Sequence, residues 1–156
     1  MKNKKLIFIL IGIVLVGVAA IFLMFKLFDN SMTPEEFKNH LAALGYEVTE
    51  QTSPVDNTLT YMVATKSDVT YNVEYFDFKN EVEAKKYYKS LKKNLINYIT
   101  STTQDSETNG NIFSKQISIS ETDYVVISRI KKTLIFIDGT SDFQSDIESL
   151  LKKLKY

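Results

Sequence analysis

The chain of 156 residues contains no cysteine. This absence excludes disulfide bonds, a lipid-modified cysteine anchor, thiolate nucleophiles and thiolate metal ligands. Histidine occurs once, as His40, and there are only five glycines, so neither a histidine-based metal cluster nor a glycine-rich phosphate loop is expected. Nineteen basic side chains balance nineteen acidic ones. The overall charge therefore gives no argument for a nucleic-acid partner.

One long uncharged run, Leu6 to Phe25, follows three lysines near the N-terminus. Twenty helical residues rise about 30 Å, which matches the hydrocarbon thickness of a bilayer. The excess of lysine before the run indicates that the N-terminal side is cytoplasmic and that the rest of the chain is outside. The predicted organisation is a cytoplasmic tail (1–5), a transmembrane signal anchor (6–28), a short linker (29–32) and an extracytoplasmic domain (33–156).

A cleaved signal peptide is the alternative for this segment. Val18-Ala19-Ala20 offers the small residues that a signal peptidase requires, which places a possible cut after Ala20. Cleavage there leaves an exposed apolar N-terminus, which favours the uncut anchor. Both interpretations export the domain.

The exported part is mildly acidic. Setting aside the four lysines and one aspartate of residues 1–29 leaves 15 basic and 18 acidic side chains, a net charge of −3. Such a balance favours solubility and argues against a general polyanion binder.

Helix signals occur at three places in residues 30–156. Thr33-Pro34-Glu35-Glu36 has the pattern of a capping box, and Gly45 is expected to end this helix with a positive φ. Asn80, with Glu83 three residues later, is expected to cap a second helix that runs to about Tyr98. Ser141 is expected to cap the last helix, which carries an apolar stripe from Phe143 to Leu154.

Extended segments lie between these helices. Residues 69–75 alternate as in a half-buried strand, whereas Leu134–Ile137 is apolar on both faces and is expected to be central. Thr100–Gly110 is polar and rich in turn formers, so it is interpreted as an exposed loop. The remaining strands are expected near residues 46–49, 59–64, 112–119 and 124–130.

The predicted fold class is α+β, in the order α-βββ-α-βββ-α, with an antiparallel sheet and about three helices packed on one face. Residues 61–93 and 124–154 both give strand, short turn, strand and a helix that ends in lysines. This parallel raises the hypothesis of an internal duplication, and a shared amphipathic pattern without common origin is the alternative explanation of the match.

The chain resembles small single-pass membrane proteins of Gram-positive bacteria that carry an exported α+β domain. The matching features are Thr33 to Phe37, Gly45-Tyr46, Tyr124 to Val126 and Leu134 to Asp138. These motifs are structural, so the resemblance implies a location and no activity.

A search for catalytic and metal-binding patterns finds no combination that requires chemistry. His40 lies beside the apolar stripe of the first helix and is interpreted as a helix-flank residue. Residues 138–142 (DGTSD) lack the alternating oxygen ligands of a calcium loop. Glu81 and Glu83 suit the start of a helix. No catalytic residue, cofactor or metal is predicted.

The second predicted helix carries a basic stripe. Lys85, Lys89 and Lys92 follow the i, i+4, i+7 spacing of one helix face, and Lys93 adjoins them. We interpret these four lysines as a candidate site for an anionic surface, such as lipid headgroups or a cell-wall polymer. A solvated helix face is the competing interpretation.

The sequence therefore predicts a non-enzymatic interaction or accessory module that is held at the outer membrane face. Its expected partners are the membrane and another membrane or cell-wall component, and no nucleic acid is expected. An extracytoplasmic sensory domain that acts through a membrane partner is the alternative, and an exported enzyme is the third class. The sequence leaves the oligomeric state open.

Overall fold

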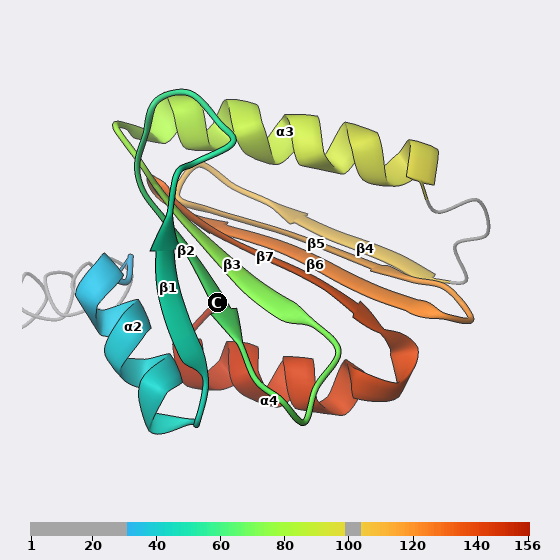
Figure 1. Ribbon diagram of the computed structural model, residues 1–156. Helices are drawn as coiled ribbons and strands as arrows, with labels where there is room; N and C mark the ends of the chain where they lie inside the picture. Colours follow the sequence, from blue (N-terminus) through green and yellow to red (C-terminus); the bar gives the residue numbers. More distant parts are fainter. Residues whose placement is uncertain (1–30, 99–103) are drawn as a thin grey trace, which may run out of the picture. The chain divides into compact units, whose positions relative to one another are not determined.

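A computed structural model describes residues 31–98 and 104–156 of the chain (Figure 1). Residues from Ser31 onward form one compact unit. The predicted tail and anchor, residues 1–28, lie outside the described residues. Among the residues that are described, no helix is long and apolar enough to cross a bilayer.

The domain is α+β, with a seven-stranded antiparallel sheet and three α-helices. The strands are β1 (Glu47–Gln51), β2 (Thr58–Thr65), β3 (Asn72–Phe78), β4 (Gln104–Asn109), β5 (Phe113–Ile119), β6 (Asp123–Ile130) and β7 (Thr133–Thr140). The helices are α2 (Pro34–Ala43), α3 (Glu81–Tyr98) and α4 (Gln144–Leu154). The strand order is β1-β2-β3-β7-β6-β5-β4, so β3 and β7 meet at the middle of the sheet.

Helices cover both faces of the sheet, so the prediction that they share one face is wrong. α3 packs on one face, while α2 and α4 pack on the other (Figure 1). Because of this double cover, β3 buries Val73 and Tyr75 on one side and Phe76 and Phe78 on the other. The alternating sequence pattern, by contrast, predicts a strand with only one buried face. The predicted central position of residues 134–137 is confirmed, since β7 pairs with both β3 and β6.

The predicted loop at Thr100–Gly110 is largely wrong. Residues Gln104–Asn109 form β4, which pairs along its whole length with β5, while residues 100–103 lie outside the described part. A strand at a sheet edge is held by backbone hydrogen bonds on one side only and keeps contact with solvent, so it needs no apolar residues. Because this segment has no alternating apolar pattern, the sequence does not predict a strand here.

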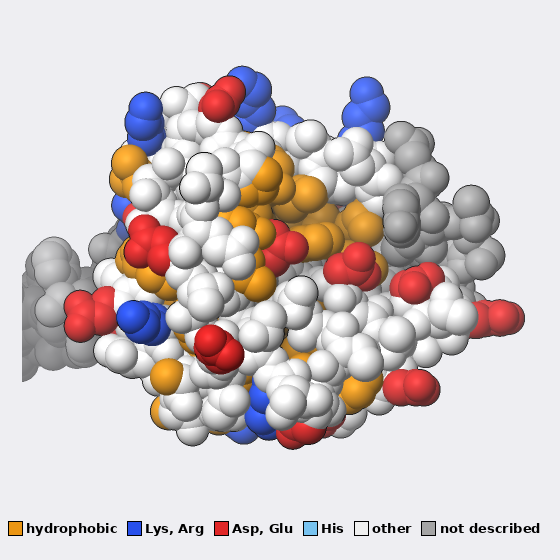
Figure 2. Space-filling view, viewed as in Figure 1, with side chains coloured by type: hydrophobic (Ala, Val, Ile, Leu, Met, Phe, Trp, Pro, Cys, Tyr) orange, Lys and Arg blue, Asp and Glu red, His pale blue; other side chains and the backbone are white. Residues whose placement is uncertain are grey.

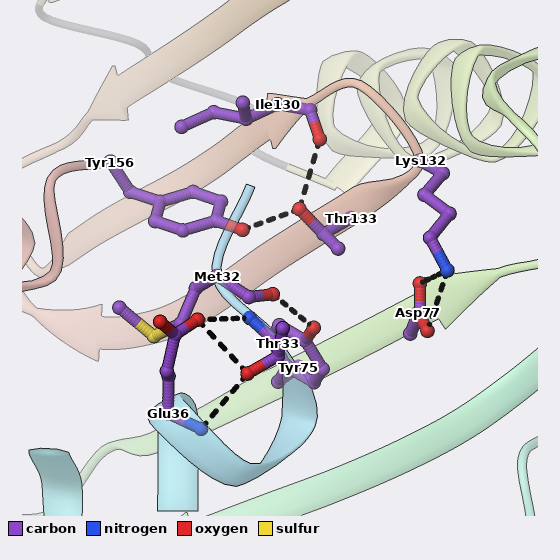
Figure 3. Close-up of polar contacts among 9 residues, drawn as sticks. All are labelled: Met32, Thr33, Glu36, Tyr75, Asp77, Ile130, Lys132, Thr133 and Tyr156. Atoms are coloured by element: carbon purple, nitrogen blue, oxygen red, sulfur yellow. Dashed lines mark hydrogen bonds and ion pairs between the residues drawn. The ribbon is translucent and has the colours of Figure 1, made fainter. Parts of the chain in front are cut away.

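The two ends of the fold are fastened to the sheet by polar contacts (Figure 3). The predicted capping box is present: the Glu36 carboxylate accepts the Thr33 N–H at 2.8 Å, and the Glu36 N–H donates to Thr33 Oγ1 at 3.2 Å. The Tyr75 hydroxyl donates to the carbonyl of Met32 at 2.6 Å. The Tyr156 and Thr133 hydroxyls lie 2.5 Å apart. The point at which the domain begins is thus tied to the central strand β3.

The last helix starts differently from the prediction. Ser141 does not cap it, because the Ser141 hydroxyl donates to the carbonyl of Glu121 at 2.9 Å and a 3₁₀ turn, Ser141–Phe143, precedes α4. Gly139 allows α4 to lie close to β7, since a Cβ there would be 2.8 Å from the Ile147 Cδ1 atom. The two other helix ends follow the prediction, with Gly45 at φ +85° and α3 running to Tyr98.

The two strand-turn-strand-helix units, β2-β3-α3 and β6-β7-α4, differ in handedness, because their helices lie on opposite faces of the sheet. A two-fold rotation that exchanges the antiparallel neighbours β3 and β7 must run perpendicular to the sheet, so it would keep α3 and α4 on the same face. They lie on opposite faces, and Tyr61 and Tyr124, which start the two compared segments, belong to opposite cores. In addition, four strands, β4 to β7, follow α3, whereas the predicted order has three strands there. This geometry contradicts the duplication hypothesis.

Candidate functional site

The helix α3 covers one face of the sheet, over an aromatic part and beside a polar part of that face. Asn80 begins it as predicted, since the Asn80 Oδ1 atom accepts the N–H of Glu83 at 3.1 Å. Its apolar stripe, which includes Ala84, Tyr88 and Leu91, packs on β3, β7 and β6. Four lysines of the same helix, Lys85, Lys89, Lys92 and Lys93, line a hollow between α3 and the polar strands β4 and β5.

A cavity of about 780 Å³ opens between α3 and the β4–β5–β6 part of the sheet. It is lined on the helix side by one tyrosine and four lysines. On the sheet side it is lined by the β4–β5 turn and its flanks. The lining residues are Lys85, Tyr88, Lys89, Lys92, Lys93, Glu107, Asn109, Gly110, Asn111, Ser114 and Arg129.

All four lysines that the sequence pattern singled out line this cavity. Lys85 and Lys92 are half-buried, whereas Lys89 and Lys93 are exposed. Lys92 forms an ion pair with Glu107 of β4. Glu107 is the only carboxylate among the described lining residues, so it offsets one of five cationic side chains. The site therefore carries an excess of positive charge on a domain whose net charge is negative.

Arg129 is the fifth cation, and sequence reasoning missed it. Its side chain is 0% exposed, on β6 beneath the cavity. Its terminal nitrogens donate to four backbone carbonyls and a hydroxyl: Lys131 O at 2.9 Å, Gly110 O at 2.9 Å, Ser114 Oγ at 3.0 Å, Ile112 O at 3.2 Å and Asn111 O at 3.2 Å. A single arginine in a strand of mixed polarity gives no sequence signal of such a role.

No carboxylate is hydrogen-bonded to Arg129 among the described residues. All its acceptors are neutral, and its Nε atom is buried without a hydrogen bond to any described group. Burial lowers the pKa of the Arg129 guanidinium, although the nearby Glu81 carboxylate acts in the opposite direction. Arginine stays protonated in proteins, so a full positive charge remains under the cavity.

The β4–β5 turn supplies neutral polar groups to the same cavity. The Ser114 hydroxyl donates to the Asn109 Oδ1 atom at 3.1 Å and receives the hydrogen bond from Arg129. Asn111 is exposed at the turn itself. Arg129 thus fixes the backbone of the turn, and the turn presents amide and hydroxyl groups opposite the lysines.

A second, smaller hollow of about 250 Å³ has balanced charges. Two lysines, Lys66 and Lys153, and two aspartates, Asp68 and Asp146, line it. Lys66 and Asp68 form an ion pair at 3.0 Å, and the Tyr46 and Tyr71 hydroxyls bond each other at 2.8 Å. Since its charges cancel, it shows no preference for a ligand of either sign.

His40 and the acidic side chains form no metal site in the part of the chain that the structure describes. His40 is exposed, and its Nδ1 atom bonds the Glu36 carbonyl within α2 at 2.8 Å. Within residues 31–98 and 104–156, no three side chains of His, Cys, Asp or Glu are grouped so that they could hold a metal ion. The described chemistry therefore centres on the basic cavity.

Comparisons with protein-family models, with curated proteins and with solved structures give no match to this chain. The cavity itself is therefore the basis for assigning a function.

Proposed function

We propose that this protein is a membrane-anchored, extracytoplasmic binding module that takes an anionic group in the basic cavity and catalyses no reaction. One observation carries the proposal: four lysines of α3 and the buried Arg129 converge on one hollow, which holds a single carboxylate among its described lining residues. Clustering like charges costs stability, since the side chains repel one another. An anion in the cavity would remove that repulsion.

The anchor limits where such a ligand can be. The predicted linker, residues 29–32, spans at most about 14 Å when fully extended. The Tyr75 hydroxyl of β3 holds the carbonyl of Met32, so the residues that follow Met32 add no length to the linker. The proposed ligand therefore belongs to the outer membrane face or to the adjoining cell wall, and the membrane is the first partner.

A sensory role is the second candidate, and the tie between Arg129 and the β4–β5 turn favours it. An anion near Arg129 would change the electrostatics of the residue that holds this turn. The predicted cytoplasmic tail has about five residues, so a signal would have to pass through a membrane partner.

The location is tested by adding protease to intact cells that express the full chain. The proposal predicts that the domain is digested while a cytoplasmic control protein survives. Survival of the domain in sealed cells, together with its digestion after lysis, would contradict the proposed orientation.

Anion binding is tested with the full chain in nanodiscs of phosphatidylcholine and fluorescent dextran sulfate as the probe. The triple variant K85E/K89E/K93E should bind at least about tenfold more weakly than the wild type. The control K38E/K86E/K152E changes the net charge by the same amount at residues that do not line the cavity. If both variants lose binding equally, only overall charge matters and the cavity proposal fails.

A further inference from the structure

We infer that the cavity binds a phosphorylated polyol, with the phosphate held by the lysines of α3 and the hydroxyl groups held by the β4–β5 turn. This inference rests on the proposed anion-binding function and names its ligand class. It follows from the size of the cavity, from the kind of cation it offers and from the neutral groups on its opposite wall.

The size of the cavity indicates more than a single small ion. Its volume of about 780 Å³ lies within the range of pockets that bury whole organic ligands, roughly 300–1,000 Å³. An isolated phosphate would fill only a small part of it. The fully buried Arg129 lies beneath the cavity.

The cations favour phosphate over carboxylate. Arg129 is the group best suited to bind a carboxylate with two parallel hydrogen bonds, but its terminal nitrogens already donate to four carbonyls and Ser114. Recognition is left to lysines, which act as mobile point charges and are common phosphate ligands. Lys89 and Lys93 are exposed at the cavity, and Arg129 adds its charge from below.

The opposite wall is mostly neutral and polar, and Glu107, its one carboxylate among the described lining residues, is paired with Lys92. Asn109, Gly110, Asn111 and Ser114 contribute amide, hydroxyl and backbone groups and no charge. Such groups both donate and accept hydrogen bonds, which is what alcohol groups require of a binding site. A cluster of lysines on one wall, and neutral polar groups beside the Lys92–Glu107 ion pair on the other, match a ligand that has a phosphate at one end and hydroxyls at the other.

The probes are glucose 6-phosphate, inorganic phosphate and glucose, each titrated calorimetrically into the full chain in phosphatidylcholine nanodiscs. Glucose 6-phosphate should bind at least about tenfold more tightly than either of the others. K89E should weaken glucose 6-phosphate and inorganic phosphate alike. N111A, at an exposed turn residue, should weaken only glucose 6-phosphate. K86E, on the same helix but outside the cavity, should change neither.

Two results would overturn the inference in distinguishable ways. If dextran sulfate binds through the cavity lysines but glucose 6-phosphate binds no more tightly than inorganic phosphate, the polyol phosphate is wrong and the anion-binding module stands. If no anion distinguishes K89E from K86E, both proposals fail. An N111A variant with wild-type affinity for glucose 6-phosphate would remove the assigned role of the turn.

The source of the polyol phosphate is distinguished by repeating the titration in phosphatidylglycerol nanodiscs, at an ionic strength that screens the surface charge of the bilayer. A lower apparent affinity for glucose 6-phosphate in these discs means that a lipid headgroup competes for the cavity. An unchanged affinity assigns the ligand to a soluble or wall-borne source. Both outcomes support the shared chemistry.

Discussion

The sheet face beneath α3 has two unlike regions. Over β2, β3 and β7 it is aromatic: the rings of Tyr61 and Phe76 lie 4.7 Å apart, and those of Phe76 and Tyr87 lie 5.1 Å apart. Over β5 and β6 it carries Arg129 and a row of buried polar residues, Ser114, Gln116 and Ser118. One helix covers both regions: its apolar stripe packs on β3, β7 and β6, and four of its lysines line the cavity in the second region.

The aromatic region also remains partly open. Figure 2 shows hydrophobic side chains in a recess below α3, on the side toward β1 and β2, with acidic side chains close by. Tyr87, Leu91 and Phe136 are only partly buried in this core. The two regions have different roles. Ring packing in the aromatic region supplies stability, whereas the polar region makes fewer apolar contacts and carries clustered positive charge. Substitutions in the first should change stability, and substitutions in the second should change binding.

The largest effect is expected from Phe76→Ala. Phe76 is fully buried and contacts the rings of Tyr61, Phe78 and Tyr87. Removing a buried phenyl ring loses transfer free energy and leaves a cavity, so the free energy of unfolding should fall by about 3–5 kcal/mol. Urea denaturation followed by circular dichroism measures this. A loss below about 1 kcal/mol would show that the aromatic region is not the main source of stability.

The polar region should respond less strongly and more locally to Arg129→Met. Methionine fills part of the space but leaves the turn carbonyls without their donor, so we expect a loss of about 2–3 kcal/mol. Hydrogen exchange should accelerate in β4 and β5 more than in β2 and β3. Equal acceleration in all strands would contradict the local role.

Ser128→Ala is a matched control for Arg129. Ser128 is the preceding residue of β6 and is fully buried, and its hydroxyl has no hydrogen-bond partner among the described groups. Removing an unsatisfied buried hydroxyl should leave the free energy of unfolding unchanged or raise it slightly.

The basic cluster should lower stability in the absence of an anion. The variant K85Q/K89Q/K93Q removes mutual repulsion and leaves the Lys92–Glu107 ion pair intact. The free energy of unfolding should rise by a few tenths to about 1 kcal/mol at low salt, and the gain should vanish at high salt because of screening. K38Q/K86Q/K152Q, whose lysines do not line the cavity, should show no such gain. A gain in both variants would point to overall charge instead.

The last prediction concerns Glu74, an acidic residue of the aromatic region. Burial raises the pKa of the Glu74 carboxyl from its ordinary value of 4.5, although the Tyr61 hydroxyl donates to it at 2.8 Å and acts in the opposite direction; the nearby Asp138 raises the pKa further. The folded state therefore binds the proton more tightly than the unfolded state. Stability should fall as the pH rises from about 4.5 through the folded-state pKa.

Glu74→Gln tests this pH dependence. Glutamine cannot ionise, so the variant should be more stable than the wild type at pH 7, and the difference should disappear as the pH falls below about 4.5. Chemical denaturation across this pH range measures the difference. A wild type that is the more stable protein at pH 7 would show that the hydrogen bond from Tyr61 outweighs burial.

Local signals in the sequence were sufficient for the elements that depend on neighbouring residues. The capping box at Thr33, the positive φ of Gly45 and the Asn80 cap each involve groups at most four residues apart, and each is confirmed. The prediction for Ser141 failed because its hydroxyl bonds Glu121, twenty residues away. The strand β4 was missed because its partner, β5, supplies the hydrogen bonds that its own composition does not suggest.

By itself, the sequence determined the α+β class, the three helices and the four lysines on one helix face, since these follow from the 3.6- and 2-residue periods of apolar and charged side chains. Only the tertiary structure decided that α3 lies on the face opposite α2 and α4, that the lysines look onto a cavity and that Arg129 lies beneath it. These properties depend on which distant strands pair. Which strands pair depends on burying the whole sheet between helices. A short stretch of sequence carries no information about that requirement.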